Sequence, residues 1–411
     1  MPTSIDATYA IVTPLFCAGA DPSRPELRLS SFKGVLRYWW RALAWSRCGR
    51  DLGVIRKQED ALFGSAGGGQ SRLNMRLAPA SAPSAVPIGT VLTVSPTDSR
   101  PVGEGARYLG YGVLEAFARR PKDGRPGTQA GQLTRACLRP PFDFTVQLRG
   151  RDLDDEDLAS VTDALIAAGT LGGMGAKGRK GYGSLVIRSL VVNETVQWSA
   201  PRAIGDLREA IGALTRDDAT DLPEFTALSK GTRHVLLASN KKEPIELLDL
   251  VGREIARFRS WGKDGIVLDR KTDPRTRELS GIESEGNFKD DHDLMKASQR
   301  KSHPRRIAFG LPHNYGKPKD QQVGPHDEHL DRRASPLFIH IHRCGDAPVA
   351  VLSFVPARFL PDGRSDISVG GDKVSQTPEN ELYRPIHDFL DRLLDPAKRG
   401  EPFSVAIEVK A

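Results

Sequence analysis

The spacing of apolar residues along the first half of the chain predicts short strands interleaved with amphipathic helices. Strands are expected where apolar and polar residues alternate or where β-branched residues follow one another. These segments are Ala7–Phe16, Leu73–Ala78, Thr90–Ser95, Phe142–Leu148 and Ser184–Val192. Helices are expected where apolar residues recur every three or four positions. These segments are Ser31–Arg47, Tyr108–Arg119 and Asp154–Ala168.

The second half of the chain repeats this alternation. The expected strands are His234–Ala238, Arg306–Gly310, Leu337–His342, Val349–Val355 and Phe403–Val409. The expected helices are Ile245–Trp261 and Glu379–Leu394. Short strands combined with two helices are typical of split β-α-β, ferredoxin-like folds. We therefore predict an α+β protein with two ferredoxin-like (RRM-like) domains in tandem.

A change of composition between Asn193 and Ala203 predicts the boundary between a domain at residues 1–195 and a domain at residues 204–411. The length agrees with two domains, because single hydrophobic cores stop growing near about 250 residues. Two polar segments, Gly262–Pro304 and Pro312–Pro325, have almost no apolar periodicity, and we expect long mobile insertions there. Such insertions either order on binding a partner or have no role, and the sequence favours neither.

The net charge is mildly positive, at +7, because 59 Lys and Arg residues outnumber 52 Asp and Glu residues. An excess of cations favours polyanionic partners such as nucleic acid. The excess is small, however, and ordinary surface charge explains it equally well. The placement of the cations is therefore more informative than their sum.

Cysteine usage and the N-terminal sequence indicate a cytoplasmic protein. The four cysteines are far apart and form no C-x-x-C pair, which argues against a disulfide scaffold and against a thiolate zinc site. Residues Met1 to Val12 lack a basic segment followed by a long apolar core, and no stretch of about 18 apolar residues occurs. We expect no association with a membrane.

The predicted helix Ser31–Arg47 has a basic face. At 100° per residue, Lys33, Arg37 and Arg41 fall on one side of the helix, and apolar residues including Trp39 fall on another. Three cations in a row are suited to hold a nucleic-acid backbone, because phosphate contacts supply most sequence-independent affinity. Considered alone, the pattern also fits a solvated basic face.

A glycine-rich segment, Gly172–Gly183, contains the pattern G-x-G-x-x-G at Gly173, Gly175 and Gly178. A dinucleotide-binding loop needs a strand before it and a helix after it, whereas here a helix precedes and a strand follows. The segment also lacks the Gly-Lys-Ser/Thr ending of a Walker loop. We therefore reject both nucleotide-binding interpretations.

The same segment carries three cations and an aromatic residue among its glycines. Glycines allow backbone N–H groups to approach an anion closely, and Lys177, Arg179 and Lys180 are suited to neutralise it. Tyr182 is placed to stack on a base. We predict a flexible loop that binds nucleic acid.

The basic helix and the glycine-rich segment together resemble the RAMP superfamily of CRISPR-associated proteins, and within it the first-subunit family of the Cmr (type III-B) effector complexes. The resemblance rests on Thr13–Phe16, Gly19–Asp21, Glu26–Arg28, Ser31–Arg41, Leu62–Gly64, Gln70–Ser71 and Gly172–Gly183. It is weaker in the second half, where it rests on Phe309–Pro312 and Arg332–Leu337.

The resemblance implies two tandem RAMP domains and assembly with other RAMP subunits around a CRISPR guide RNA. It also implies contact with the guide 3′ region, the target RNA, or both. Target cleavage in these complexes belongs to the repeated backbone subunit, so a non-catalytic role without a cofactor is expected. The alternative is a metal-dependent endoribonuclease that uses Asp21, since backbone RAMP subunits carry an aspartate in a comparable loop. Asp21-Pro22 also fits an ordinary turn.

Histidine-based chemistry is not expected, because the first predicted domain contains no histidine. His340 and His342 alternate on one predicted strand, but without a third ligand a packed or solvated pair fits better than a metal site. The acidic run Asp290–Asp293 is interpreted as a solvated loop rather than a metal site.

Overall fold

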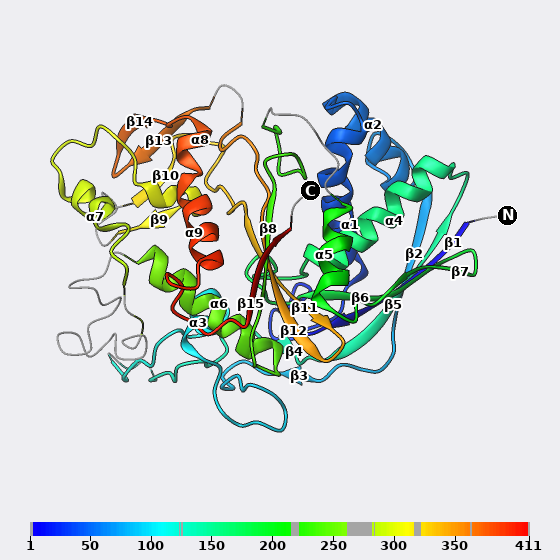
Figure 1. Ribbon diagram of the computed structural model, residues 1–411, viewed down its shortest axis with the longest axis horizontal. Helices are drawn as coiled ribbons and strands as arrows, with labels where there is room; N and C mark the ends of the chain where they lie inside the picture. The colour runs from blue at the N-terminus through cyan, green and yellow to red at the C-terminus, as the bar shows by residue number, and fades with distance from the viewer. Residues whose placement is uncertain are drawn as a thin grey trace.

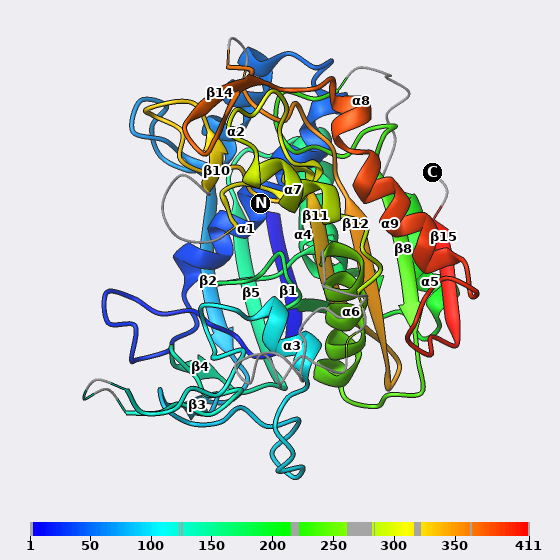
Figure 2. The same cartoon turned by 90° about the vertical axis from the view of Figure 1, so that its left-hand side faces the viewer.

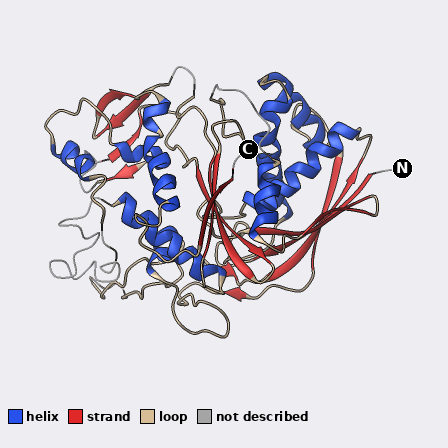
Figure 3. Ribbon diagram, viewed as in Figure 1, coloured by secondary structure: helices blue, strands red, loops and turns tan. Residues whose placement is uncertain are grey.

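In a computed structural model, the described chain forms two antiparallel sheets with helices packed on them, a third sheet of short strands and a two-stranded sheet (Figures 1 and 3). The residues described are 3–122, 124, 126–214, 222–260, 282, 284–315, 322–361 and 364–409. A mixed α/β structure with antiparallel sheets agrees with the predicted class. In the described part of the chain, no helix combines the length and apolarity needed to cross a bilayer.

The first sheet belongs to the first half of the chain. Its strand order is β2 (Leu73–Pro79), β5 (Phe142–Gly150), β1 (Thr3–Ile11), β6 (Leu185–Val192) and β7 (Thr195–Ser199). Helices α1 (Leu29–Arg47) and α4 (Asp155–Leu171) pack against each other, and Trp40 Nε1 on α1 donates to Ser160 Oγ on α4 at 2.9 Å. Alternate residues of β5 are buried beneath them, as the alternating sequence predicts. Helix α2 (Leu52–Phe63) follows α1.

The second sheet belongs to the second half. Its strand order is β11 (Leu337–Cys344), β12 (Ala347–Phe354), β8 (Arg233–Ala238) and β15 (Val405–Val409). The helices associated with it are α6 (Pro244–Arg259) and α9 (Arg384–Leu394). Strand β11 lies at the edge of this sheet, beside the glycine-rich segment and β6 of the first half. The two halves therefore meet along β11.

A second contact between the halves joins the short helix α3 (Glu104–Leu109) to α6, and the views in Figures 1 and 2 agree on this pairing. The helices touch at two glycines. A Cβ at Gly105 would lie 2.0 Å from Asp249 O, and a Cβ at Gly252 would lie 2.1 Å from Gly105 O. The two large hydrophobic clusters each contain residues from both halves, for example Trp39 with Phe338.

The remaining elements are short. The third sheet has the order β14 (Asp372–Ser375), β13 (Asp366–Val369), β10 (Gln322–Pro325) and β9 (His313–Asn314). Beside it lie α7 (Lys289–Lys296), the 3-10 helix η2 (Arg305–Phe309) and α8 (Glu379–Leu382). Helix α5 (Ile204–Gly212) follows β7, and β3 (Ala85–Val86) pairs with β4 (Cys137–Leu138).

Three expected elements are wrong. The helix expected at Tyr108–Arg119 is instead α3, which ends at Leu109 before the glycines 110 and 112. The segment Thr90–Ser95 forms isolated bridges rather than a strand. The strand expected at Arg306–Gly310 is instead η2 (Arg305–Phe309), because the buried Asp291 accepts hydrogen bonds from the first N–H groups of that turn.

The polar segment Gly262–Pro304 is only partly described, since residues 261–281 and 283 lie outside the described residues. Its described part contains α7, so the expectation of a loop throughout is wrong there. The acidic run Asp290–Asp293 belongs to this helix, and Asp291 is buried rather than solvated. In the segment Pro312–Pro325, residues 316–321 lie outside the described residues, and β9 and β10 occupy part of the rest.

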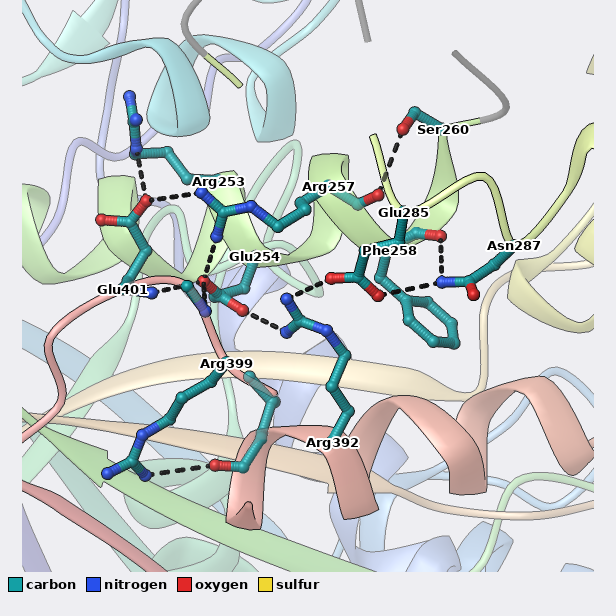
Figure 4. Close-up of polar contacts among 12 residues, drawn as sticks. Arg253, Glu254, Arg257, Phe258, Ser260, Glu285, Asn287, Arg392, Arg399 and Glu401 are labelled. Carbon is teal, nitrogen blue, oxygen red and sulfur yellow. Dashed lines mark hydrogen bonds and ion pairs between the residues drawn. The ribbon is translucent and has the colours of Figure 1, made fainter. Parts of the chain in front are cut away.

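A buried ionic network holds the second half together (Figure 4). Glu254 on α6 is fully buried and forms ion pairs with Arg392 on α9 and with Arg257. Arg257 Nη1 lies 2.6 Å from Glu254 Oε1. The amide N–H groups of Gly400 and Glu401 donate to the same carboxylate at 3.0 and 2.7 Å. A buried carboxylate with this many donors is compensated for its lost hydration.

Candidate nucleic-acid interface

Helix α1 and the glycine-rich segment meet in an open cavity of about 510 Å³, called the glycine-loop groove below. Its α1 residues are Ser31, Gly34, Val35, Tyr38 and Trp39. Its loop residues are Gly172, Gly173, Gly175, Lys177, Gly178, Arg179 and Lys180. Ala334, Ser335 and Phe338 close it from the second half. None of these described lining residues is acidic, while three are cations, so the groove has a positive potential.

The glycine-rich loop is an ordered structure rather than the flexible loop that we expected. Ala176 N donates to Phe16 O at 2.8 Å, and Met174 N donates to Gly183 O at 2.9 Å. Gly175 has φ of +80°, and a Cβ there would lie 2.4 Å from Phe16 O. At Gly173 a Cβ would lie 2.6 Å from the Gly178 carbonyl oxygen. The loop's own close packing therefore requires glycine at these positions.

Arg179 joins the loop to the two other walls of the groove. Its guanidinium carbon lies 5.2 Å from the ring centre of Tyr38 on α1 and 4.7 Å from that of Phe338 on β11. Arg179 Nη1 donates to Ser335 O at 3.2 Å, and the Arg179 carbonyl accepts from Ile339 N at 3.0 Å. Arg179 thus positions the groove walls as well as contributing charge.

Among the described residues no carboxylate is paired with the three groove cations, and Lys177 and Lys180 also lack the aromatic contacts of Arg179. Burial, and then the neighbouring Arg135 and Arg332, lower the pKa of Lys177. Burial, and then Arg259, lower the pKa of Lys180 from 10.5 to about 7. Buried amines crowded by other cations are less easily charged, and a bound anion would stabilise their charged form. The two lysines are therefore suited to bind phosphate.

The cations of α1 are not all in the groove. Arg37 and Arg41 line a neighbouring cavity of about 570 Å³. Glu59 on α2, whose side chain is 8% exposed, lies 2.7 Å from Arg37 Nε and 3.5 Å from Arg41 Nε. Lys33 is half-buried, and burial followed by the charge of Arg37 lowers its pKa. The expected continuous basic face is thus partly neutralised by one buried glutamate.

Tyr182 does not reach the surface. It is fully buried, and its hydroxyl donates to Ala106 O at 2.7 Å. The expectation that Tyr182 stacks on a base is therefore wrong for this conformation, because no face of its ring is accessible. Its hydroxyl needs a buried partner, and it finds one in α3.

The residues considered for catalysis lie apart from one another. Asp21 is exposed in a turn, where Ser23 N and Ser23 Oγ donate to its carboxylate at 2.9 and 2.6 Å. The Ser23 hydroxyl is also the main cause that lowers the pKa of Asp21. His340 and His342 form a packed pair on β11, with 3.3 Å between His340 Nε2 and His342 Nδ1. No group of three metal-ligating side chains is found among the described residues.

The contribution of the second half to the groove was not anticipated. Ser335 and Phe338 are part of the site, although neither was predicted as a site residue, and the same is true of Tyr38 on α1 in the first half. A signal was present in Arg332–Leu337, a segment that resembles the first-subunit family and that includes Ser335. Its contact with the glycine-rich loop depends on tertiary packing that local pattern does not encode.

Comparisons with known proteins find a family model and two relatives that match this chain. A model of the RAMP superfamily matches residues 8–186. The chain is 25% identical over 358 residues to the CRISPR system Cmr subunit Cmr1-1 of Pyrococcus furiosus, covering 83% of this chain and 84% of that protein. It is 44% identical over 54 residues to Cmr1-2 of the same organism, covering 13% of this chain and only 29% of that protein.

A solved structure is similar in fold over nearly the whole chain. The crystal structure of Cmr1 from Pyrococcus furiosus in its apo form superposes with a TM-score of 0.51 at 18% identity. The superposition covers 93% of this chain and 96% of that one. At this identity the likeness concerns the fold and does not extend to individual side chains.

Proposed function

The chain is a RAMP-superfamily protein that resembles the first Cmr subunit, and from this premise we propose that it is a non-catalytic RNA-binding subunit of a type III-B CRISPR effector complex. The observation that carries the proposal is the glycine-loop groove, which Lys177, Arg179 and Lys180 line and whose described lining residues include no acidic one. Phosphate contacts of this kind bind RNA without reading its sequence.

The proposed RNA site centres on the groove and extends along α1. Lys177 and Lys180 bind phosphate, and Arg179 positions the loop while adding charge. Because Gly173, Gly175 and Gly178 have no side chains, they allow the loop backbone to approach the RNA strand closely. Lys33, Arg37 and Arg41 extend the basic surface past Tyr38, which lines both cavities. RNA is expected to compete with Glu59 for the two arginines.

The proposed architecture is two ferredoxin-like domains in tandem, at residues 1–195 and 204–411. The chain order β1-α1-β2-β5-α4-β6 with the spatial order β2-β5-β1-β6 supports it for the first domain. The chain order β8-α6-β11-β12-α9-β15 with the spatial order β11-β12-β8-β15 supports it for the second.

The proposed partners are the CRISPR guide RNA, through its 3′ region, the target RNA, and other RAMP subunits of a Cmr complex in the cytoplasm. The support is that the relative matching 83% of this chain is itself a subunit of a Cmr system. Co-purification of a tagged chain with small RNA and other RAMP subunits tests this assignment. Recovery of the chain alone from cells that express the whole system would contradict it.

Binding of labelled single-stranded RNA by the purified chain, measured by anisotropy across a salt series, tests the groove. The double variant Lys177→Ala/Lys180→Ala is expected to bind more weakly and with a shallower salt dependence. Lys373→Ala is the matched control, since its side chain is exposed on β14 in the third sheet. Equal affinity and slope for all three proteins would exclude the groove as the RNA site.

A metal-dependent endoribonuclease that uses Asp21 is the second candidate. Its support is limited to the position of Asp21 between β1 and α1, because its carboxylate is occupied by the turn at Ser23. Incubation of the assembled complex with guide, complementary RNA and Mg²⁺ decides the question when the backbone subunit's own site is disabled. RNA cutting that is lost in Asp21→Asn would support this candidate, and intact RNA would exclude it.

A further inference from the structure

Tyr111 stands at the tip of a tight turn that follows α3. The N–H groups of Val113 and Leu114 both donate to Gly110 O, at 2.9 and 3.2 Å, and Gly112 has φ of +91°. Val113 and Leu114 are buried, whereas the Tyr111 side chain is 64% exposed. Among the residues that the structure describes, Tyr111 is the one exposed large aromatic. The fold thus holds this ring out to solvent on an anchored turn.

The turn lies directly against the glycine-rich loop. A Cβ at Gly112 would lie 4.0 Å from Lys177 Nζ, so the ammonium group of the groove borders the residue next to Tyr111. On the other side of the turn, a Cβ at Gly110 would lie 2.8 Å from the hydroxyl of Tyr182. The turn therefore packs against the loop, and Tyr111 lies beside the groove.

Two further cations surround this place. Arg135 is exposed and follows Thr134, whose N–H donates to Val113 O at 3.0 Å and whose hydroxyl donates to Gly112 O at 3.4 Å. Arg332 lies near enough to act on the charge of Lys177, as Arg135 does. In the described chain, the carboxylate within ion-pair distance of these cations is Asp331, 3.9 Å from Arg332, with both side chains largely exposed. Such a pair holds its cation weakly.

We propose that Tyr111 stacks on a base of single-stranded RNA whose neighbouring phosphates are held by Lys177, Arg135 and Arg332. This inference rests on the proposed function and adds a base contact beside the groove, where the turn after α3 borders Lys177. An exposed aromatic ring among cations is the arrangement by which proteins bind single strands, with stacking on the ring and phosphates on the cations. The surplus of cations favours RNA over a protein surface at this turn.

The test is anisotropy of labelled short single-stranded RNA with four variants of the purified chain over a salt series. Tyr111→Ala is expected to weaken binding about tenfold without changing the salt slope, because stacking involves no ion release. Tyr111→Phe keeps the ring and is expected to bind like the wild type. Arg135→Ala is expected to weaken binding and to reduce the slope of the logarithm of affinity against the logarithm of salt concentration by about 0.7. Val196→Ala, an equally exposed apolar residue on β7, is the control.

The outcomes separate this inference from the proposed function. If Tyr111→Ala binds like the wild type while the groove variant Lys177→Ala/Lys180→Ala binds more weakly, the stacking proposal is wrong and the proposed groove function is retained. If the wild-type chain binds no RNA, both proposals fail. If Tyr111→Ala keeps its RNA affinity but loses other RAMP subunits on co-purification, the turn is a protein contact and the stacking proposal is overturned. The proposal would also be overturned if Tyr111→Phe lost as much RNA affinity as Tyr111→Ala, because the ring that stacks is kept in Tyr111→Phe.

Discussion

The guanidinium carbon of Arg179 lies 4.7 Å from the centre of the Phe338 ring, which connects the glycine-rich loop of the first half to β11 of the second. The neighbouring backbones are also joined, because Ile339 N donates to the Arg179 carbonyl. The groove is therefore assembled from both halves of the chain. Its shape depends on a planar cation held between aromatic rings on different elements.

Replacing Arg179 by lysine tests this positioning role because it keeps the charge. A lysine lacks the planar guanidinium that lies near Tyr38 and Phe338, and it cannot reproduce the same donor geometry toward Ser335. We expect a loss of about 1 kcal/mol of stability and several-fold weaker RNA binding. Thermal melting and RNA anisotropy measure the two effects. Lys177→Arg is the control, and wild-type values for Arg179→Lys would show that Arg179 acts through charge alone.

A second prediction concerns the glycine-rich loop. Gly175→Ala places a Cβ 2.4 Å from Phe16 O in a residue with φ of +80°, so both contact and backbone conformation are strained. We expect a destabilisation of about 2 kcal/mol or more. Gly205→Ala in α5 is the control, because nothing lies within 4 Å of its Cβ, and it is expected to be neutral or stabilising. Similar midpoints in urea unfolding for both variants would refute the loop packing described above.

The sequence was informative where one element's own pattern decides its structure. Strand β5 and the shared face of His340 and His342 follow from alternation along single strands. Helix α1 follows from apolar spacing and was predicted nearly to its ends. The placement of the glycine-rich segment between a helix and a strand was likewise correct.

The sequence was misleading where tertiary partners decide. Tyr182 has the composition of a stacking residue, but its hydroxyl meets a carbonyl in α3, and this contact buries it. Tyr111 was assigned to the helix that apolar spacing predicted at Tyr108–Arg119, although the glycines on both sides of it already indicate a turn. Glu59 neutralises Arg37 and Arg41 from another helix, which no periodicity within α1 reveals.

A third prediction concerns the buried network of Figure 4. Glu254→Gln removes the charge that compensates Arg392, whose side chain is 5% exposed, and leaves a buried cation with less compensation. We expect a loss of about 3 kcal/mol, seen as a lower midpoint of chemical unfolding. Lys398→Ala, which breaks the exposed pair with Asp395, is the control and is expected to change stability by less than about 0.5 kcal/mol. Equal midpoints would mean that the network contributes no more than a surface pair.

The pH dependence of unfolding provides a fourth prediction. The pKa of Lys180 falls from 10.5 to about 7 on folding, so between these values the unfolded chain binds more protons at this residue than the folded chain. The contribution of Lys180 to the free energy of unfolding therefore rises with pH across that window. The difference in unfolding free energy between the wild type and Lys180→Met is expected to change in favour of the wild type from pH 7 to pH 9. A difference that stays constant would show that Lys180 keeps its ordinary pKa.

RNA binding is expected to respond to pH in the opposite direction. The free Lys180 amine is charged below about pH 7, and a bound phosphate favours its charged form, so binding takes up a proton above that pH. Affinity for single-stranded RNA is therefore expected to fall as pH rises from 6 to 8.5, by up to about tenfold. Lys180→Arg is the control, because a guanidinium stays charged throughout and its variant should bind with little dependence on pH. If the wild type and Lys180→Arg show the same pH profile, Lys180 does not contact the RNA backbone, since a contact would link its proton to binding.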